Sequence, residues 1–317
     1  MQAGGIGGVT EAKRHAVVLG LGLMGCDISA IFLAGGWRVT AVEPAGAIPE
    51  RLERVRTSLV QLGADAGAVV ALDLVERIEE IDFTAAELVI EAVPERLDLK
   101  REVFAKLDRL VPGGIPVATN ASGFRITDIA RDCATRERMA NLHFFLPAHI
   151  VPGVEVVRGE HTDPAICERL AEIMESLGRK SIRVSRDVPG FLANRIQHAL
   201  MREAFAAIDQ GLATAEDVDA AVRYAFGFRY VAAGPILQKE LAGLETQLAA
   251  AETIYPSLCN DVTPSPTLQR LVSEGRLGAK TGLGFRAWPP EAVESERARY
   301  ERTLLAATRL LKEEVPG

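Results

Sequence analysis

Four polar side chains could together oxidise a secondary alcohol. Ser122 follows the apolar run IPVATN, His143 lies in NLHFFL, Glu155 lies in VEVV, and Asn194 follows PGF at the start of a helical pattern. A histidine near its ordinary pKa of about 6.5 can accept a hydroxyl proton at neutral pH. A carboxylate on the other ring nitrogen fixes the tautomer, and the serine and asparagine can hold the substrate oxygen. This set is typical of a dehydrogenase.

Each of these residues also has a simpler interpretation. A histidine in a strand is often only hydrogen-bonded within the core, and a lone glutamate is usually a surface residue. Ser122 could be the N-cap of the next helix, and Asn194 could be an exposed helix residue. The combination favours catalysis over a protein that merely binds a nicotinamide, since such a protein has no chemical need for all four. A serine hydrolase is a weaker alternative, because the chain has no GxSxG motif.

A glycine-rich turn near the N-terminus predicts a dinucleotide site. The sequence GLGLMG places Gly20, Gly22 and Gly25 in a GxGxxG pattern, with Leu23 and Met24 between the last two glycines. An apolar strand precedes the motif and a helical pattern follows it. Gly20 allows a tight turn, Gly22 lets the backbone approach a pyrophosphate, and Gly25 lets the helix pack near the strand. We expect these five residues to contact the cofactor.

Glu43 indicates which dinucleotide binds. A second apolar strand over 37–42 ends at this glutamate, about 20 residues after the glycines. A carboxylate there accepts hydrogen bonds from both ribose hydroxyls of NAD and repels the 2′-phosphate of NADP. The alternative is a tight glycine turn in some other β–α unit. Because the strand, the helix and the acid occur in order, we expect NAD as the cofactor.

Composition excludes several other classes of protein. The chain has 317 residues, 48% hydrophobic and 25% charged, with a net charge of -7, which is typical of a soluble globular protein. Basic residues alternate with acids in ERLERVR and RARYERTL, so we expect solvated helix faces and no nucleic-acid surface. No apolar run reaches the ~18 residues of a membrane span. Residues 1–14 are glycine-rich and predict a disordered lead-in, not a signal peptide.

Cysteine and histidine spacing predicts no metal site. The four cysteines lie far apart without CxxC spacing, and the five histidines show no HExxH spacing. We therefore expect free, buried thiols and a reducing cytoplasm.

Strands alternate with helices as far as Asp187. Apolar runs predict strands over 16–19, 37–42, 87–93, 115–120, 141–146, 154–157 and 181–185. Helical periodicity predicts helices over 44–62, 97–110, 126–131 and 164–177. This alternation predicts an α/β domain with a doubly wound parallel sheet over 15–187. Only helical patterns follow, near 190–211, 214–227, 234–255 and 294–313, so we expect an all-α domain over 188–317.

Several motifs resemble the 3-hydroxyacyl-CoA dehydrogenase family. They are GLGLMG, EAVPERLDLK, ATNASG, NLHFFLP, VEVV, DVPGFLANRI and GAKTGLGF, and together they span nearly the whole chain. The resemblance implies an NAD-binding Rossmann domain joined to a helical domain that dimerises. It implies His143 as catalytic histidine, Glu155 as its partner, and Ser122 and Asn194 as substrate contacts. Further residues expected near the cofactor are Glu95 and Asn120.

Two departures from the family concern the substrate. The asparagine of the family's HFFNP motif is Leu146 here, and the stretch between Glu43 and Glu87 is shorter than the helical hairpin that contacts coenzyme A. The segment AFGFRY, followed by GP, resembles the lambda-crystallin and L-gulonate 3-dehydrogenase-like branch, which acts on free hydroxy acids. That resemblance implies that Arg229 anchors a substrate carboxylate. The alternatives are a CoA thioester substrate and an exposed arginine at a helix end.

The helical domain is expected to form a homodimer. Several of its helices carry apolar stripes, including Ile196, Leu200, Phe205 and Ile208, and together these are more than a domain of this size covers alone. The resembled family also dimerises through this domain.

Overall fold

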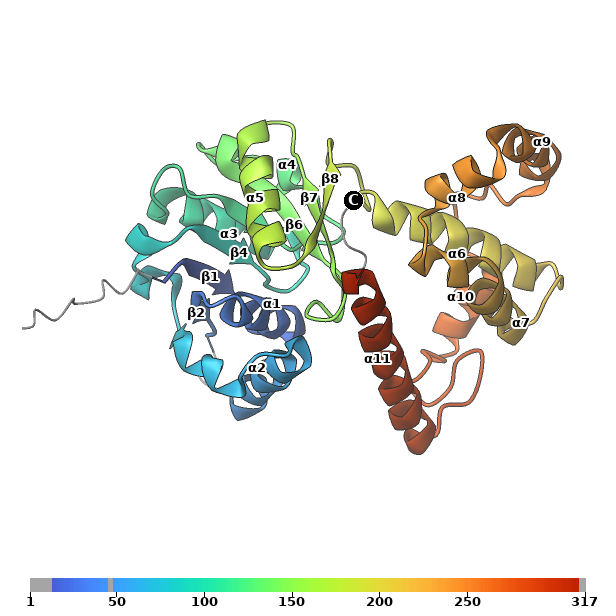
Figure 1. Ribbon diagram of the computed structural model, residues 1–317, viewed down its shortest axis with the longest axis horizontal. Helices are drawn as coiled ribbons and strands as arrows, with labels where there is room; N and C mark the ends of the chain where they lie inside the picture. The colour runs from blue at the N-terminus through green and yellow to red at the C-terminus, as the bar shows by residue number, and fades with distance from the viewer. Residues whose placement is uncertain (1–12, 45–47, 314–317) are drawn as a thin grey trace, which may run out of the picture. The chain divides into compact units, whose positions relative to one another are not determined.

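In the first part of the chain, the strands that alternate with helices form one sheet (Figure 1). A computed structural model describes residues 13–44 and 48–313, apart from the side chain of Lys312. The lead-in expected over 1–14 thus lies outside the described residues except for its last two. The chain divides into two units, Met1–Leu192 and Ala193–Gly317, whereas the sequence patterns suggest a boundary near Asp187.

Eight strands make up the sheet. They are β1 (His15–Leu19), β2 (Arg38–Val42), β3 (Leu72–Val75), β4 (Leu88–Glu91), β5 (Val117–Thr119), β6 (Met139–Phe144), β7 (Gly153–Val157) and β8 (Lys180–Val184). Their order is β3-β2-β1-β4-β5-β6-β7-β8. The predicted α/β, doubly wound architecture is confirmed. The sheet is not wholly parallel, because β7 pairs with β6 in antiparallel orientation and β8 follows β7.

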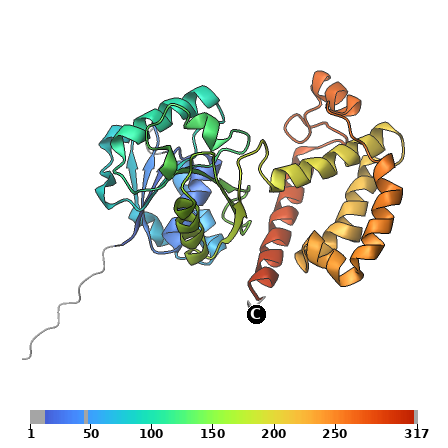
Figure 2. The same cartoon turned by 90° about the horizontal axis from the view of Figure 1, so that it is seen from above.

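Helices cover both faces of this sheet. One core includes α1 (Leu23–Ala34), α2 (Pro49–Leu62) and α5 (Pro164–Ser176), and the other includes α3 (Leu97–Leu110) and α4 (Ile126–Ile129). Figure 2 shows α3 and α5 on opposite faces. Residues of β1 alternate between the two cores, since successive strand side chains point to opposite faces. Short 3₁₀ segments connect the elements at Ala66–Ala71, Ile78–Glu80, Phe83–Ala85 and Arg136–Arg138.

Two details of the first unit differ from the sequence patterns. Strand β3 is not among the strands that the sequence patterns predict. Its sequence LDLV is short, and its residues are not fully buried. Alternation of apolar and polar residues over only four positions is too weak a signal to predict an edge strand. Helix α2 begins at Pro49, later than expected, because proline at the first helical position is favourable and proline inside a helix is not.

The second unit is helical. Its elements are α6 (Ala193–Asp209), α7 (Ala215–Ala220), the π-helical turn η5 (Ala221–Phe226), the 3₁₀ segment η6 (Gly227–Val231), α8 (Pro235–Ala242), α9 (Leu244–Ile254), the 3₁₀ segment η7 (Tyr255–Ser257), α10 (Pro266–Ser273) and α11 (Pro290–Glu313). The run expected over 234–255 breaks at Gly243, whose φ of 97° only glycine adopts readily. Helix α10 is not among the expected elements. No helix in the described ranges is long and apolar enough to cross a membrane.

A buried ion pair joins β4 to α3 at the carboxyl edge of the sheet. Nζ of Lys100 donates to Glu91 Oε1 at 2.8 Å and to Oε2 at 3.1 Å, and the two side chains are 1% and 0% exposed. The same carboxylate accepts hydrogen bonds from the Thr119 hydroxyl at 2.6 Å and the Val93 amide at 2.7 Å. With its oxygens satisfied, this group ties β4, β5 and α3 together.

Lys100→Met is expected to destabilise the chain because it leaves the Glu91 carboxylate buried without its cation. Losing one partner of a buried pair costs about 3–5 kcal/mol. The free energy of urea unfolding of the full chain measures this effect. Lys106→Met is the matched control on the same helix, because Lys106 pairs with Glu79 at the exposed surface and its loss should cost under ~1 kcal/mol. Equal losses in the two variants would contradict the role given to the buried pair.

Candidate functional site

The glycine turn opens a cavity of about 990 Å³ at the carboxyl ends of β1, β2 and β4. Gly20 has a φ of +93°, and a Cβ there would come within 2.8 Å of the carbonyl oxygen of Ala92. A Cβ on Gly25 would collide with the carbonyl oxygen of Gly20. Both glycines are therefore required by the packing of the turn against β4 and α1.

Gly22 has a different role from the other two glycines. A Cβ at this position would meet no atom within 4 Å, and the residue lines the cavity. Gly22 is also the N-cap of α1 and provides no side-chain cap, so the first amides of the helix at Leu23 and Met24 have no side-chain acceptor at that cap. An open approach to a helix N-terminus fits a pyrophosphate. The turn therefore fits the dinucleotide that the sequence predicts.

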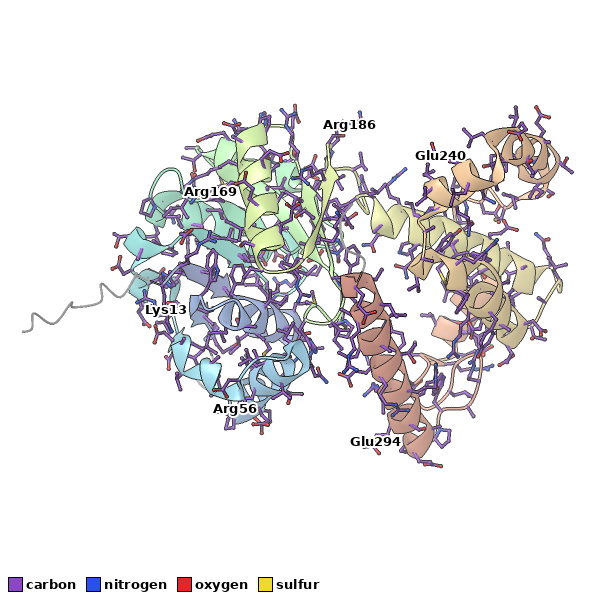
Figure 3. All side chains as sticks on the ribbon, in the orientation of Figure 1. Lys13, Arg56, Arg169, Arg186, Glu240 and Glu294 are labelled. Carbon is purple, nitrogen blue, oxygen red and sulfur yellow. The ribbon has the colours of Figure 1, made fainter. Side chains whose placement is uncertain are left out.

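Glu43 follows β2 directly and is 8% exposed. Its Oε2 accepts a hydrogen bond from the Leu21 amide at 3.3 Å and forms an ion pair with Arg51 of α2. Sequence reasoning missed Arg51, because the basic residues of ERLERVR were expected on a solvated face. Arg56 does lie on the outer side of α2 (Figure 3). In contrast, Arg51 pairs with Glu43, just after β2, and Arg54 pairs with the buried Asp27 of α1. Helical periodicity alone carries no signal for these partners.

His143 and Glu155 are opposite each other in the antiparallel pair β6–β7. Nδ1 of His143 lies 2.8 Å from Oε2 of Glu155, and the two residues are 4% and 0% exposed. Oε1 of Glu155 accepts the amide of Leu192 at 3.0 Å. The rings of Phe145 and Phe191 pack edge-on against the imidazole, with ring centroids 4.6 and 5.5 Å from its own. The carboxylate thus fixes the proton on Nδ1 and leaves the Nε2 lone pair able to accept another.

A second buried histidine has a different environment. Nδ1 of His149 lies 3.0 Å from Oδ2 of Asp27, and its Nε2 lies 2.5 Å from Oε1 of Gln61. Burial opposes ionisation of Asp27, but the bonds from His149 and Arg54 outweigh it and lower the pKa of this carboxyl. Nε2 of His149 is thus hydrogen-bonded to Gln61, whereas Nδ1 has only an ion-pair contact with Asp27, and these contacts join α1, α2 and the β6–β7 loop. In the described part of the chain, Nε2 of His143 has no hydrogen-bond partner.

The loop after β5 places the next predicted residues. Oε1 of Glu95 accepts the amides of Ser122 at 3.1 Å and Gly123 at 2.9 Å, and its Oε2 lies 3.2 Å from Nζ of Lys100. Oδ1 of Asn120 accepts the amide of Phe144 at 2.9 Å, beside His143. The Ser122 residue is exposed. It is not the N-cap of α4, because that helix begins after Arg125.

The sequence reasoning missed Lys100, although it lies in the quoted run EAVPERLDLK. A lysine at a position that helical periodicity turns inward is the signal that could have identified it. Lys100 links the buried pair with Glu91 to the loop that carries Ser122.

Asn194 and Arg229 lie in the second unit. Asn194 is in the first turn of α6, and Arg229 is an exposed residue of η6. Their roles toward the substrate stay predictions.

Within the described ranges, no group of three or more His, Cys, Asp or Glu side chains could hold a metal ion. All four cysteines are free, and burial raises the pKa of Cys26, Cys133 and Cys167 to about 11. These three thiols therefore stay protonated at neutral pH and are poor nucleophiles.

Two family models match the chain. The model described as "3-hydroxyacyl-CoA dehydrogenase, NAD binding domain" matches residues 15–188, and "3-hydroxyacyl-CoA dehydrogenase, C-terminal domain" matches residues 190–288. Helix α11 lies wholly beyond both matches.

Individual proteins are similar over most of the chain. A 5-formyl-3-hydroxy-2-methylpyridine 4-carboxylate 5-dehydrogenase from Mesorhizobium japonicum is 31% identical over 94% of this chain and 98% of its own. An L-carnitine dehydrogenase from Streptomyces griseus is 37% identical over 82% of this chain and 80% of its own. The fold of this chain is also similar to the crystal structure of an NAD⁺-dependent 5-formyl-3-hydroxy-2-methylpyridine 4-carboxylic acid 5-dehydrogenase. The two chains superpose with a TM-score of 0.86 and are 30% identical. The match covers 96% of this chain and 100% of the other.

Proposed function

Because this chain belongs to the 3-hydroxyacyl-CoA dehydrogenase family and is an NAD-dependent oxidoreductase acting on CH–OH groups, we propose that it oxidises a free 3-hydroxy acid with His143 as general base. The observation that carries the assignment of the base is the difference between the two buried histidines that lie against a carboxylate. Both have a carboxylate partner, but only His143 keeps Nε2 unpartnered in the described residues.

The cofactor supplies the hydride acceptor when bound, held by the glycine turn and Glu43. The residues of the chain manage the proton. Nε2 of His143 accepts the proton of the substrate hydroxyl as the carbon–oxygen bond becomes a carbonyl. Glu155 holds the ring in the required tautomer and stabilises the imidazolium that forms. Ser122 and Asn194 are the groups that would hold the substrate oxygen, and Phe145 and Phe191 keep water from the ring.

His143→Gln is expected to lower the turnover rate by about 10²–10⁴, because the hydroxyl proton loses its acceptor. Glu155→Gln should lower it in the same range, and Glu155→Asp should recover part of the loss because it restores the charge. NADH oxidation or formation measures the rate, and calorimetry checks that NADH still binds. The exposed His161 supplies the control variant His161→Gln. Near-normal turnover in the His143 or Glu155 variants would show that the base is elsewhere.

We propose a free acid because the observations favour a small carboxylate substrate. The two similar dehydrogenases are named for L-carnitine and for a pyridine carboxylate, both free carboxylates. Leu146, 56% exposed after β6, presents an apolar side chain at the position of the family's asparagine. Arg229 forms no ion pair within the described ranges, and a guanidinium can bind a carboxylate through two parallel hydrogen bonds.

Arg229→Ala is expected to raise KM for free acids by roughly tenfold or more, given ~1.5–3 kcal/mol for a charge-assisted bond. Arg229→Lys should also weaken binding, because lysine lacks the planar fork. Thioesters lack the carboxylate charge and should respond little. Arg223→Ala is the control, because Arg223 lies over the ring of Tyr224 in the preceding turn. A higher kcat/KM for 3-hydroxyacyl-CoA than for any free acid, with Arg229→Ala silent on both, would restore the thioester alternative.

We also propose a homodimer formed through the second unit, in a reducing compartment such as the cytoplasm. Large apolar side chains on this unit are exposed, among them Phe228 at 73%, Leu241 at 77% and Leu248 at 62%. Ile196 and Leu200 of the predicted stripe are exposed as well. The absence of disulfides at all four cysteines supports the compartment. Sedimentation should give twice the 34.1 kDa of the chain, and a monomer at micromolar concentration would contradict the dimer.

A further inference from the structure

An arginine at the start of α2 lies against the acid that follows β2. Arg51 and Glu43 form an ion pair, and the same carboxylate oxygen accepts the Leu21 amide. The two side chains are 32% and 10% exposed, so the pair is partly shielded from water. Both residues line the dinucleotide cavity.

This position is unfavourable for a cation without a partner. Arg51 is the third residue of α2, which begins at Pro49, and the positive end of the helix dipole lies in this first turn. Cations are stabilised at the other end of a helix. Glu43 therefore compensates both the charge of the guanidinium and its place at the helix N-terminus.

The other cations of the cavity have a different partner. Arg77 and Lys106 also line it, and both pair with Glu79, at 3.7 and 3.2 Å. Of these three cations, Arg51 alone pairs with Glu43, the acid that follows β2. That acid is the group expected at the 2′-hydroxyl of the cofactor's ribose, where an arginine accommodates the 2′-phosphate of NADP-dependent enzymes.

We propose that Arg51 is a specificity-determining residue of the cofactor site, a guanidinium suited to a 2′-phosphate that Glu43 neutralises. The inference rests on the proposed function, in which Glu43 accepts the ribose hydroxyls of NAD. In the wild-type chain the carboxylate excludes the phosphate by occupying the arginine as well as by its own charge. Removing Glu43 leaves a cation and a helix N-terminus together, and both attract phosphate. The variant should therefore gain affinity for NADP in addition to losing affinity for NAD.

Calorimetric titration of the full chain tests this with NADH, NADPH, AMP and 2′,5′-ADP. The last two ligands differ only by the 2′-phosphate and need no turnover. Glu43→Ala should bind 2′,5′-ADP and NADPH roughly tenfold or more tightly than the wild-type chain, the size of one charge-assisted hydrogen bond. The double variant Glu43→Ala/Arg51→Ala should lose this gain. Arg51→Ala alone should weaken NADPH further and leave NADH bound.

Two controls separate the possible causes. Glu43→Ala/Arg77→Ala should keep the gain, because Arg77 lines the same cavity but pairs with Glu79. AMP should show no comparable gain in any variant, and circular dichroism confirms that each variant folds. A gain absent from Glu43→Ala, kept in the double variant with Arg51, or lost with Arg77 would overturn the proposal. Failure of NADH to bind the wild-type chain would instead contradict the cofactor assignment, and this inference with it.

Discussion

The antiparallel pairing of β6 with β7 is the constraint on which the proposed chemistry depends. Residues 145–152 join the two strands and are too few for the crossover that a parallel pair needs, so the chain must reverse direction. The register then places His143 directly opposite Glu155, where side chains on one face are neighbours. Burial of both residues removes competing water and makes the carboxylate the partner of Nδ1.

Three buried carboxylates of this unit are each paired with a cationic side chain. Glu91 with Lys100, Asp27 with Arg54 and His149, and Glu43 with Arg51 all lie at or near the carboxyl ends of strands or at the helices beside them. An isolated ion in such places would cost several kcal/mol, whereas a paired and hydrogen-bonded one is tolerated. The glycine turn and the loop that carries Ser122 are held against the carboxyl edge of the sheet by backbone contacts and by Glu95.

The relationship to known dehydrogenases and the geometry support different parts of the conclusion. Similarity over nearly the full chain supports the family, the cofactor and the type of reaction. The geometry distinguishes His143 from His149, although both have carboxylate partners. The relationship to known dehydrogenases does not by itself make this distinction. The helical unit adds exposed apolar surface and an arginine without an ion pair in the described ranges, and these motivate the proposals about assembly and substrate.

The sequence by itself determined the elements whose signals are local. The glycine turn, the strands near His143 and Glu155, and helix α3 all follow from periodicity and residue type. Tertiary structure alone decided the edge strand β3, the break at Gly243 and the partners of Lys100 and Arg51. Periodicity reports which face of a helix turns toward the core. It cannot report which acid from a distant strand meets a given cation there, because that depends on how the helix packs on the sheet.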